Sequence, residues 1–128
     1  MSSVKFRFLI APRNRCGALT ELCICRLPER TPLQQIVAVD QIRHRQPDSL
    51  YIEDETTFFH VYGDIFGCGI YNNLLSGPPD PCGINYYPPS RAEEILAALS
   101  TTTLPDSETL AAWLRRVRQY NGFYLLGL

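Results

Sequence analysis

The sequence predicts one α+β domain over residues 1–128, in which an antiparallel or mixed sheet of four to five strands packs against about three helices. A chain of 128 residues fits a single domain with its own core, and no linker or internal repeat divides it. The N-terminal residues alternate between apolar and polar types, whereas the C-terminal third repeats apolar residues at helical spacing. The predicted order, ββα, β, a long loop, αα and β, indicates the α+β class.

The first third predicts two strands and a helix. Residues 4–10 alternate as a half-buried strand does, and residues 18–27 form the second strand, paired with the first as a hairpin. Residues 30–47 predict a helix that Thr31 caps, with Pro32 at the first position and Pro47 as the stop. The apolar faces of the two strands hold Val4, Phe6, Phe8 and Ile10, and Leu19, Cys23, Cys25 and Leu27.

The middle third predicts strands followed by a long loop. Residues 51–52 suit a short strand, and residues 56–62, rich in β-branched and aromatic side chains, suit a central one. Residues 67–89 are rich in glycine and proline and predict an irregular loop, with room for one helical turn at 70–75.

The last third predicts two helices and a closing strand. Residues 90–100 form a helix with a capping box of Ser90 and Glu93. Residues 107–120 form another, which starts from Asp106 or Ser107 and ends at Gly122 in a left-handed cap. Residues 123–128 are apolar and predict the final strand.

The cysteines indicate free thiols in a reducing compartment. There are five of them, an odd number, and the N-terminus lacks the apolar core of an export signal, so we expect a cytoplasmic protein. Cys23 and Cys25 lie on one face of a predicted strand and suit small core residues. A zinc site needs more Cys or His at ligand spacing than this chain offers, so we expect neither a metal nor another cofactor.

Charge is distributed unevenly along the chain. The net charge is −1, yet residues 46–90 contain six acidic side chains and no Lys or Arg, together with eight of the aromatic residues. Residues 1–45 are basic, with eight Lys or Arg against three acidic residues. We expect no binding to nucleic acid, because the sequence pI is near 6.1 and the aromatics lie away from the arginines. No apolar run approaches the length of a membrane span.

Two catalytic hypotheses compete with structural roles. Cys68, between two glycines, with His60 as its base would make a small cysteine-dependent hydrolase. The acidic run at residues 53–55 lacks a partner acid at the spacing of a hydrolase, and a solvated turn explains it. We therefore favour a protein that is not an enzyme, and keep the cysteine hydrolase and an adaptor subunit of a larger assembly as alternatives.

The acidic, aromatic span is typical of a protein-binding surface. Tyrosine offers a large contact area at low entropic cost, and carboxylates around it steer a basic partner. Because Tyr71, Tyr86 and Tyr87 fall in the predicted loop, we expect them to be at least partly exposed. The expected partner-binding residues are Asp54, Glu55, Asp64, Tyr71, Asp80, Tyr86 and Tyr87.

Three segments in the C-terminal half of the chain resemble those of a known class of proteins. The segments "GDIFGCGIYNN", "GINYYPPSRAEEIL" and "WLRRVRQYNGFYLLGL" resemble those of small bacterial immunity proteins, the cytosolic antidotes of polymorphic and contact-dependent toxins. The resemblance covers roughly residues 60–128. It is a general likeness in the kind of sequence, because these segments contain no motif that is diagnostic of one family. It implies a non-catalytic α+β protein that binds and blocks one cognate toxin domain, often basic. The basic N-terminal third departs from this picture and leaves the contact face open.

Overall fold

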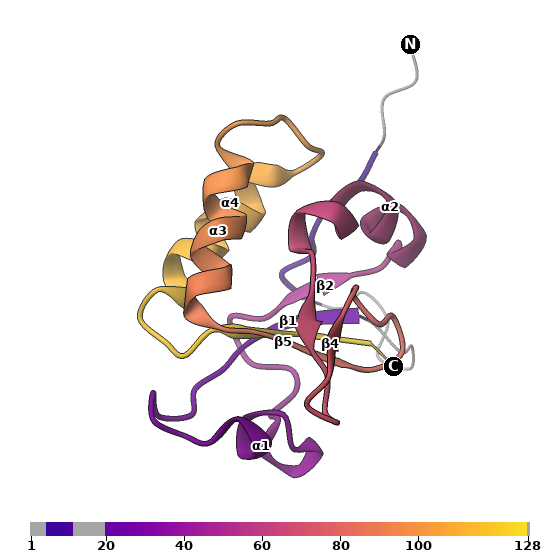
Figure 1. Ribbon diagram of the computed structural model, residues 1–128. Coiled ribbons are helices and arrows are strands. Elements are labelled where there is room, and N and C mark those ends of the chain that lie inside the picture. Colours follow the sequence, from indigo (N-terminus) through magenta and orange to yellow (C-terminus); the bar gives the residue numbers. More distant parts are fainter. Residues whose placement is uncertain (1–4, 12–19, 128) are drawn as a thin grey trace.

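The computed structural model describes residues 5–11 and 20–127, and within them the chain forms an α+β fold around one antiparallel sheet (Figure 1). The described sheet has six strands in the order β2-β1-β6-β5-β3-β4, more than the four to five predicted. β6 lies between β1 and β5 and joins the two halves of the sheet. The strands are β1 (Thr20–Ile24), β2 (Leu50–Ile52), β3 (Gly69–Ile70), β4 (Ser76–Gly77), β5 (Ile84–Tyr87) and β6 (Phe123–Leu126).

Helices cover the sheet unequally on its two faces. Figure 1 shows α2, α3 and α4 on one side of the sheet and the short α1 on the other. The described helices are α1 (Leu33–Ile36), the 3₁₀ turn η1 (Val39–Gln41), α2 (Glu55–Phe66), α3 (Pro89–Leu99) and α4 (Ser107–Val117). Each face has its own hydrophobic core, so central strands are buried on both sides.

The register explains how the two cores are filled. Cys23 of β1 lies opposite Tyr124 of β6, and Tyr124 lies opposite Tyr86 of β5. Because alternate residues point to opposite faces, these three share the face under α1, and their neighbours face the long helices. We call the helix-covered cluster the first core, which includes Leu22, Phe58, Tyr87, Ile95, Leu114 and Phe123. The second core includes Cys23, Cys25, Ile36, Val37, Tyr86 and Tyr124.

The strand predicted at residues 56–62 is wrong, because this segment belongs to α2. The Asp54 carboxylate accepts a hydrogen bond from the Thr57 backbone N–H and so caps the helix. Phe58, Tyr62 and Phe66 recur at a spacing of four and are all buried in the first core. Packing of this apolar face outweighs the β propensity of the individual residues.

The helix predicted at residues 30–47 is wrong in extent and in its cap. Only α1 and η1 form, and Ala38 between them has an extended backbone. Thr31 does not cap α1, whose N-cap is Pro32 with no side-chain hydrogen bond. The Ile36 carbonyl at the end of α1 accepts from the Tyr124 hydroxyl at 2.6 Å, which ties this end of the helix to β6.

The predicted hairpin between the first two strands is also wrong, because β1 pairs with β2 and β6. Leu9 instead forms an isolated bridge with Tyr51 of β2. Phe6 and Phe8 are buried as expected, but Ile10 is 80% exposed. Val4, Cys16 and Leu19, which the sequence placed in strands or among the free thiols, lie outside the described residues.

The segment 67–89 is more ordered than the predicted loop, since it holds β3, β4 and β5. No helical turn forms at 70–75, where the chain makes the turn of the β3–β4 hairpin instead. The C-terminal predictions are confirmed more closely, since α3, α4 and β6 form. The left-handed cap of α4 is wrong, because α4 ends at Val117 and its C-cap Arg118 is right-handed, although Gly122 does have a left-handed φ of 80°. The Ser90–Glu93 capping box is wrong, because Pro88 is the N-cap and Glu93 accepts from Arg118.

Candidate functional site

Tyr86 and Tyr87 are core residues, and the expectation that they are exposed is wrong. Their exposed fractions are 2% and 0%. They are successive residues of β5, so one ring enters each core. The Tyr87 ring stacks on Phe123 with 5.0 Å between centroids, while the Tyr86 ring lies 5.5 Å from that of Tyr124. Neither tyrosine is available to a partner.

The two buried hydroxyl groups differ in their partners. The Tyr86 hydroxyl donates to the Asn121 backbone carbonyl at 2.7 Å. The Tyr87 hydroxyl is fully buried and has no hydrogen-bond partner among the described residues. Burial raises the pKa of both phenols, so both stay neutral at physiological pH.

The predicted acidic residues do not gather at one place. Asp54 and Glu55 lie at the N-terminal end of α2, whereas Asp64 is exposed near its C-terminal end, about 15 Å further along the axis. Hydrogen bonds from the Thr57 hydroxyl and N–H lower the pKa of the Asp54 carboxyl, in keeping with its role as a cap. Glu55 is half-buried in the first turn of the same helix.

Asp80 and Tyr71 shape the segments that flank β4. The exposed Asp80 accepts from the Cys82 N–H at 2.9 Å, and its backbone makes two hydrogen bonds to the Asn85 side-chain amide. Tyr71 is half-buried, and its hydroxyl donates to the Pro78 carbonyl across the hairpin. Of the seven predicted binding residues, five therefore keep some exposure, and two of those five already have structural roles in loops.

The cysteine hydrolase finds no support in the local geometry. Cys68 follows the end of α2 and is exposed, and His60 is exposed on α2 itself. Within the described part of the chain no hydrogen bond joins these two side chains, and no group of three or more potential metal ligands occurs there. Cys23 is buried, its thiol donates to the Arg43 carbonyl at 3.0 Å, and burial raises its pKa to about 12. Cys23 and Cys25 thus fill the second core, as predicted.

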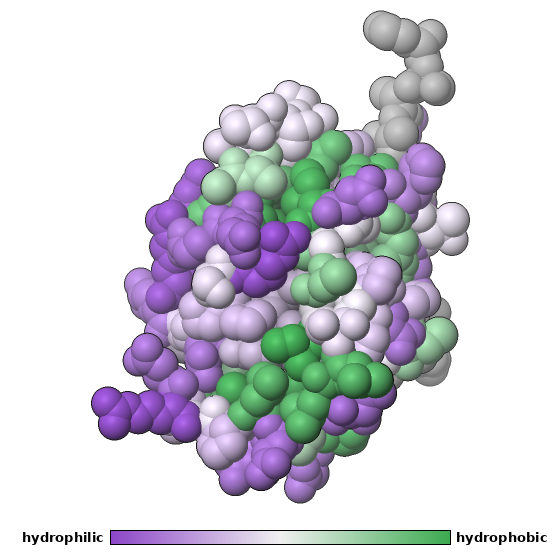
Figure 2. All heavy atoms as spheres, viewed as in Figure 1, coloured by the Kyte–Doolittle hydropathy of each residue, from purple (hydrophilic) through white to green (hydrophobic). Residues whose placement is uncertain are grey.

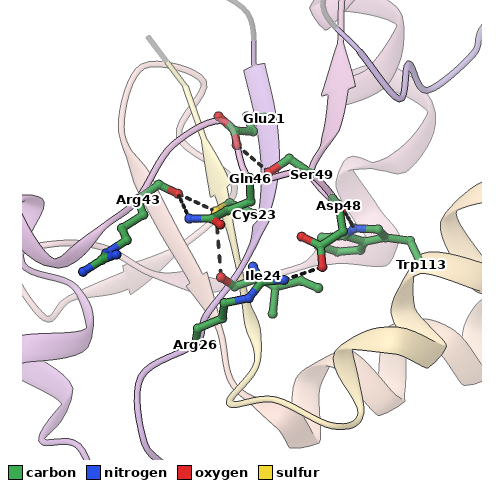
Figure 3. A network of polar contacts seen from close by, with 9 residues as sticks. All are labelled: Glu21, Cys23, Ile24, Arg26, Arg43, Gln46, Asp48, Ser49 and Trp113. Carbon is green, nitrogen blue, oxygen red and sulfur yellow. Dashed lines mark hydrogen bonds and ion pairs between the residues drawn. The ribbon is translucent and has the colours of Figure 1, made fainter.

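A buried carboxylate that we did not single out from the sequence holds the segment before β2 (Figure 3). Glu21 of β1 accepts from the Ser49 hydroxyl at 2.6 Å and from the Arg45 N–H at 2.7 Å, and His44 lies 3.7 Å from it. Because these partners are fixed to one segment, we assign Glu21 a structural role. A single acid inside the apolar run of residues 19–25 was the available signal.

The same network continues through Asp48 to α4. Arg26 forms an ion pair with the Asp48 carboxylate, and the Trp113 indole N–H donates to the Asp48 carbonyl at 2.6 Å. Arg26 also lies over the Tyr120 ring, 5.0 Å from its centroid. A cleft of about 400 Å³ lies beside Arg26 and Arg118, but Arg118 is paired with Glu93. Both cations that face this cleft are therefore already neutralised.

Exposed apolar side chains gather on the face of the molecule that carries α1. Figure 2 shows a green area over the lower part of this view, where Figure 1 places α1 and the tip of the β3–β4 hairpin. The exposed fractions are 38% and 65% for Leu33 and Val39, and 47% and 65% for Leu74 and Leu75. We call these four residues the apolar patch. Apolar surface gathered in this way is typical of an interaction site.

The hairpin holds its two leucines in a defined turn. The Tyr71 N–H donates to the Leu75 carbonyl at 2.8 Å, and the Leu74 N–H donates to the Tyr71 carbonyl at 3.0 Å. The Asn73 side chain accepts from the Leu75 N–H. Two leucines within a segment of turn residues are the sequence signal for this site.

Comparisons place no known protein beside this fold: neither a protein-family model, nor a curated protein, nor a solved structure matches the chain. Among the described helices, none combines the length and the apolar composition that a membrane crossing requires.

Proposed function

We propose that this protein is a non-catalytic inhibitor, an immunity protein of the cytoplasm that binds one basic toxin domain and blocks it. The observation that carries the proposal is the apolar patch, half of which lies inside the span of residues 46–90 that contains no Lys or Arg. The patch replaces Tyr86 and Tyr87 as the centre of the binding surface. The resemblance of residues 60–128 to immunity proteins supports the choice of a toxin as the partner.

The physical argument combines apolar burial with charge. Apolar side chains that are exposed in the free protein supply binding energy when a partner covers them, about 1–2 kcal/mol for each leucine. The span of residues 46–90, which contains Leu74 and Leu75, has exposed carboxylates such as Asp64 and Asp80 and no Lys or Arg, and this charge favours a basic partner. An apolar centre with a charged rim is the usual anatomy of a protein interface.

The test uses the C-terminal domain of the protein that the adjacent upstream gene encodes, which this proposal predicts to be a basic toxin. We expect a one-to-one complex in light scattering and titration calorimetry, and rescue of cells that produce the toxin. Val39→Ser combined with Leu75→Ser is expected to weaken binding at least tenfold. Ile10→Ser is the matched control, because Ile10 is exposed beside β2, the strand at the opposite edge of the sheet from β4. A tight complex that tolerates the double variant as well as the control would refute the proposed surface.

A further inference from the structure

A cavity lies beside the start of β2, where β1 continues past the end of the pairing between these two strands. β1 pairs with β6 as far as Ile24 but with β2 only as far as Leu22. The Asp48 carbonyl, just before β2, accepts from the Trp113 indole N–H instead of extending that pairing. The cavity has a volume of about 320 Å³, and besides Ile24 it is lined by Arg26, Leu27, Gln41, Arg43, Gln46 and Tyr124.

The lining of this cavity combines cations and amides with apolar groups, and no carboxylate of a described residue belongs to it. Leu27 and Tyr124 supply the apolar part, and the Tyr124 hydroxyl donates into the second core, so its ring is held in one orientation. By contrast, the cleft beside Arg118 includes Glu29 in its lining, and the cavity beside the N-terminal segment includes Asp106. Cations without acids around one cavity concentrate a positive potential there, which attracts anions.

Arg43 supplies the uncompensated charge of this lining. Its carbonyl accepts from the Cys23 thiol at 3.0 Å and from the Gln46 side-chain amide at 3.2 Å, so its backbone is fixed. Its guanidinium has no hydrogen bond or ion pair among the described residues, and Figure 3 shows the side chain extending away from the Glu21 carboxylate. Arg26, in contrast, is already in an ion pair. One free positive charge in the lining fits a ligand with one negative charge.

We infer that this cavity binds a small monocarboxylate with an apolar or aromatic body. The carboxylate accepts hydrogen bonds from the Arg43 guanidinium and the Gln41 side-chain amide, and the body contacts Leu27 and Tyr124. A planar carboxylate matches the fork of a guanidinium, whereas a phosphate dianion brings a second charge that this lining does not balance.

The size of the cavity limits the size of the ligand. Cavities that hold drug-sized ligands have volumes of roughly 300–1,000 Å³, so this one takes a ligand at the lower end of that range. The inference goes beyond the proposed function and does not depend on it, because the site uses none of the four residues of the apolar patch.

The test uses benzoate as the probe and benzamide, its neutral isostere, as the comparison. In a nuclear magnetic resonance titration of the isotope-labelled protein, benzoate is expected to cause saturable shifts at the backbone N–H groups of Leu27, Gln41 and Arg43. The expected dissociation constant is about 1–10 mM, which is usual for a ligand of this size. Benzamide and inorganic phosphate are expected to bind at least about tenfold more weakly, because the first lacks the charge and the second lacks the apolar body.

Two matched variants separate a site at Arg43 from a general effect of positive charge. Arg43→Gln is expected to weaken benzoate binding at least about tenfold and to leave the melting temperature unchanged, because the guanidinium is exposed and has no described partner. Arg45→Gln removes the same charge from an exposed residue that does not line the cavity, and is expected to bind benzoate as the wild type does.

Three outcomes would overturn the inference. Equal weakening by Arg43→Gln and Arg45→Gln would mean that benzoate responds only to the general positive charge of this segment. Shifts that do not saturate, or that occur away from the residues lining the cavity, would show that no site exists there. Binding of benzamide as tight as that of benzoate would exclude an anion as the ligand.

Discussion

Removing the hydroxyl group from each of the adjacent tyrosines of β5 is expected to have opposite effects on stability. Tyr86→Phe deletes a buried hydrogen bond of 2.7 Å to the Asn121 carbonyl. Tyr87→Phe deletes a hydroxyl that is buried without a partner among the described residues. The two substitutions remove the same atom from neighbouring, fully buried rings, so they form a matched pair.

The expected magnitudes follow from what each substitution leaves behind. After Tyr86→Phe, no other described side chain donates to the Asn121 carbonyl, and a buried unpaired acceptor costs about 1–3 kcal/mol. We therefore expect Tyr86→Phe to lower the free energy of unfolding by about 1–2 kcal/mol. Tyr87→Phe leaves no unpaired group and removes a desolvated hydroxyl, so we expect a change between zero and about 1 kcal/mol of added stability.

Urea unfolding followed by circular dichroism measures the difference. With a denaturant slope of about 2 kcal/mol per molar urea, a gap of about 2 kcal/mol separates the two midpoints by about 1 M. Tyr71→Phe, at an exposed hydrogen bond to the Pro78 carbonyl, is the control and is expected to lie close to wild type. Equal destabilisation by Tyr86→Phe and Tyr87→Phe would refute the reasoning, since it would mean that the Tyr87 hydroxyl has a partner.

Three further predictions concern glycines, thiols and alkaline pH. In Gly63→Ala in α2, the added methyl group meets no atom within 4 Å, so the free energy of unfolding should rise by about 0.5–1 kcal/mol. In Gly122→Ala, the residue has a φ of 80° and the methyl group meets the Tyr87 carbonyl oxygen, so the free energy of unfolding should fall by about 2 kcal/mol or more. Thermal unfolding measures both changes. At pH 8 the buried Cys23 thiol, with a pKa of about 12, is ionised in only about 10⁻⁴ of the molecules. Peptide mapping after alkylation should therefore find the exposed Cys68 and Cys82 labelled and Cys23 unlabelled. Early labelling of Cys23 would contradict its burial. The pKa values of the buried tyrosines are raised in the folded protein, namely those of Tyr51, Tyr62, Tyr86, Tyr87 and Tyr124. Above about pH 10 the unfolded chain therefore loses phenol protons that the folded chain retains, and the free energy of unfolding should fall by up to about 1.4 kcal/mol per pH unit for each buried tyrosine. A free energy of unfolding that does not change from pH 9 to 11 would be inconsistent with the raised pKa values.

Local signals predicted the C-terminal third well because there they agree with the tertiary structure. Helix α4 shows amphipathic spacing around Trp113. Gly122, just before β6, has the left-handed conformation that only glycine adopts freely, although it does not cap α4. The sequence of α2 contained equally clear signals, namely the Asp54 cap and the recurrence of Phe58 and Tyr62 four residues apart. β-branched and aromatic residues masked them, because propensity is a weak guide to a segment that packing decides.

Interactions between residues far apart in sequence account for two of the predictions that failed. Residues 30–47 carry the local signals of one helix. In the fold, however, the Tyr124 hydroxyl donates to the Ile36 carbonyl and the Arg45 N–H donates to the Glu21 carboxylate, so two points of this segment are held by β1 and β6. Tyr86 and Tyr87 looked like loop residues because a strand buried on both faces shows no alternation of polar and apolar side chains. Neither effect can be found from neighbours in sequence, since the partners lie far along the chain.

The edge position of the β3–β4 hairpin argues for recognition by side chains and against recognition by strand addition. β4 is the outermost strand, yet it has only two residues, Ser76 and Gly77. Pro78 and Pro79 follow at once, and because proline has no N–H they end the row of donors that an added strand would need. A partner that approaches this edge would therefore contact the tip of the hairpin, where Leu74 has a left-handed backbone conformation. This edge therefore offers few backbone donors for strand addition.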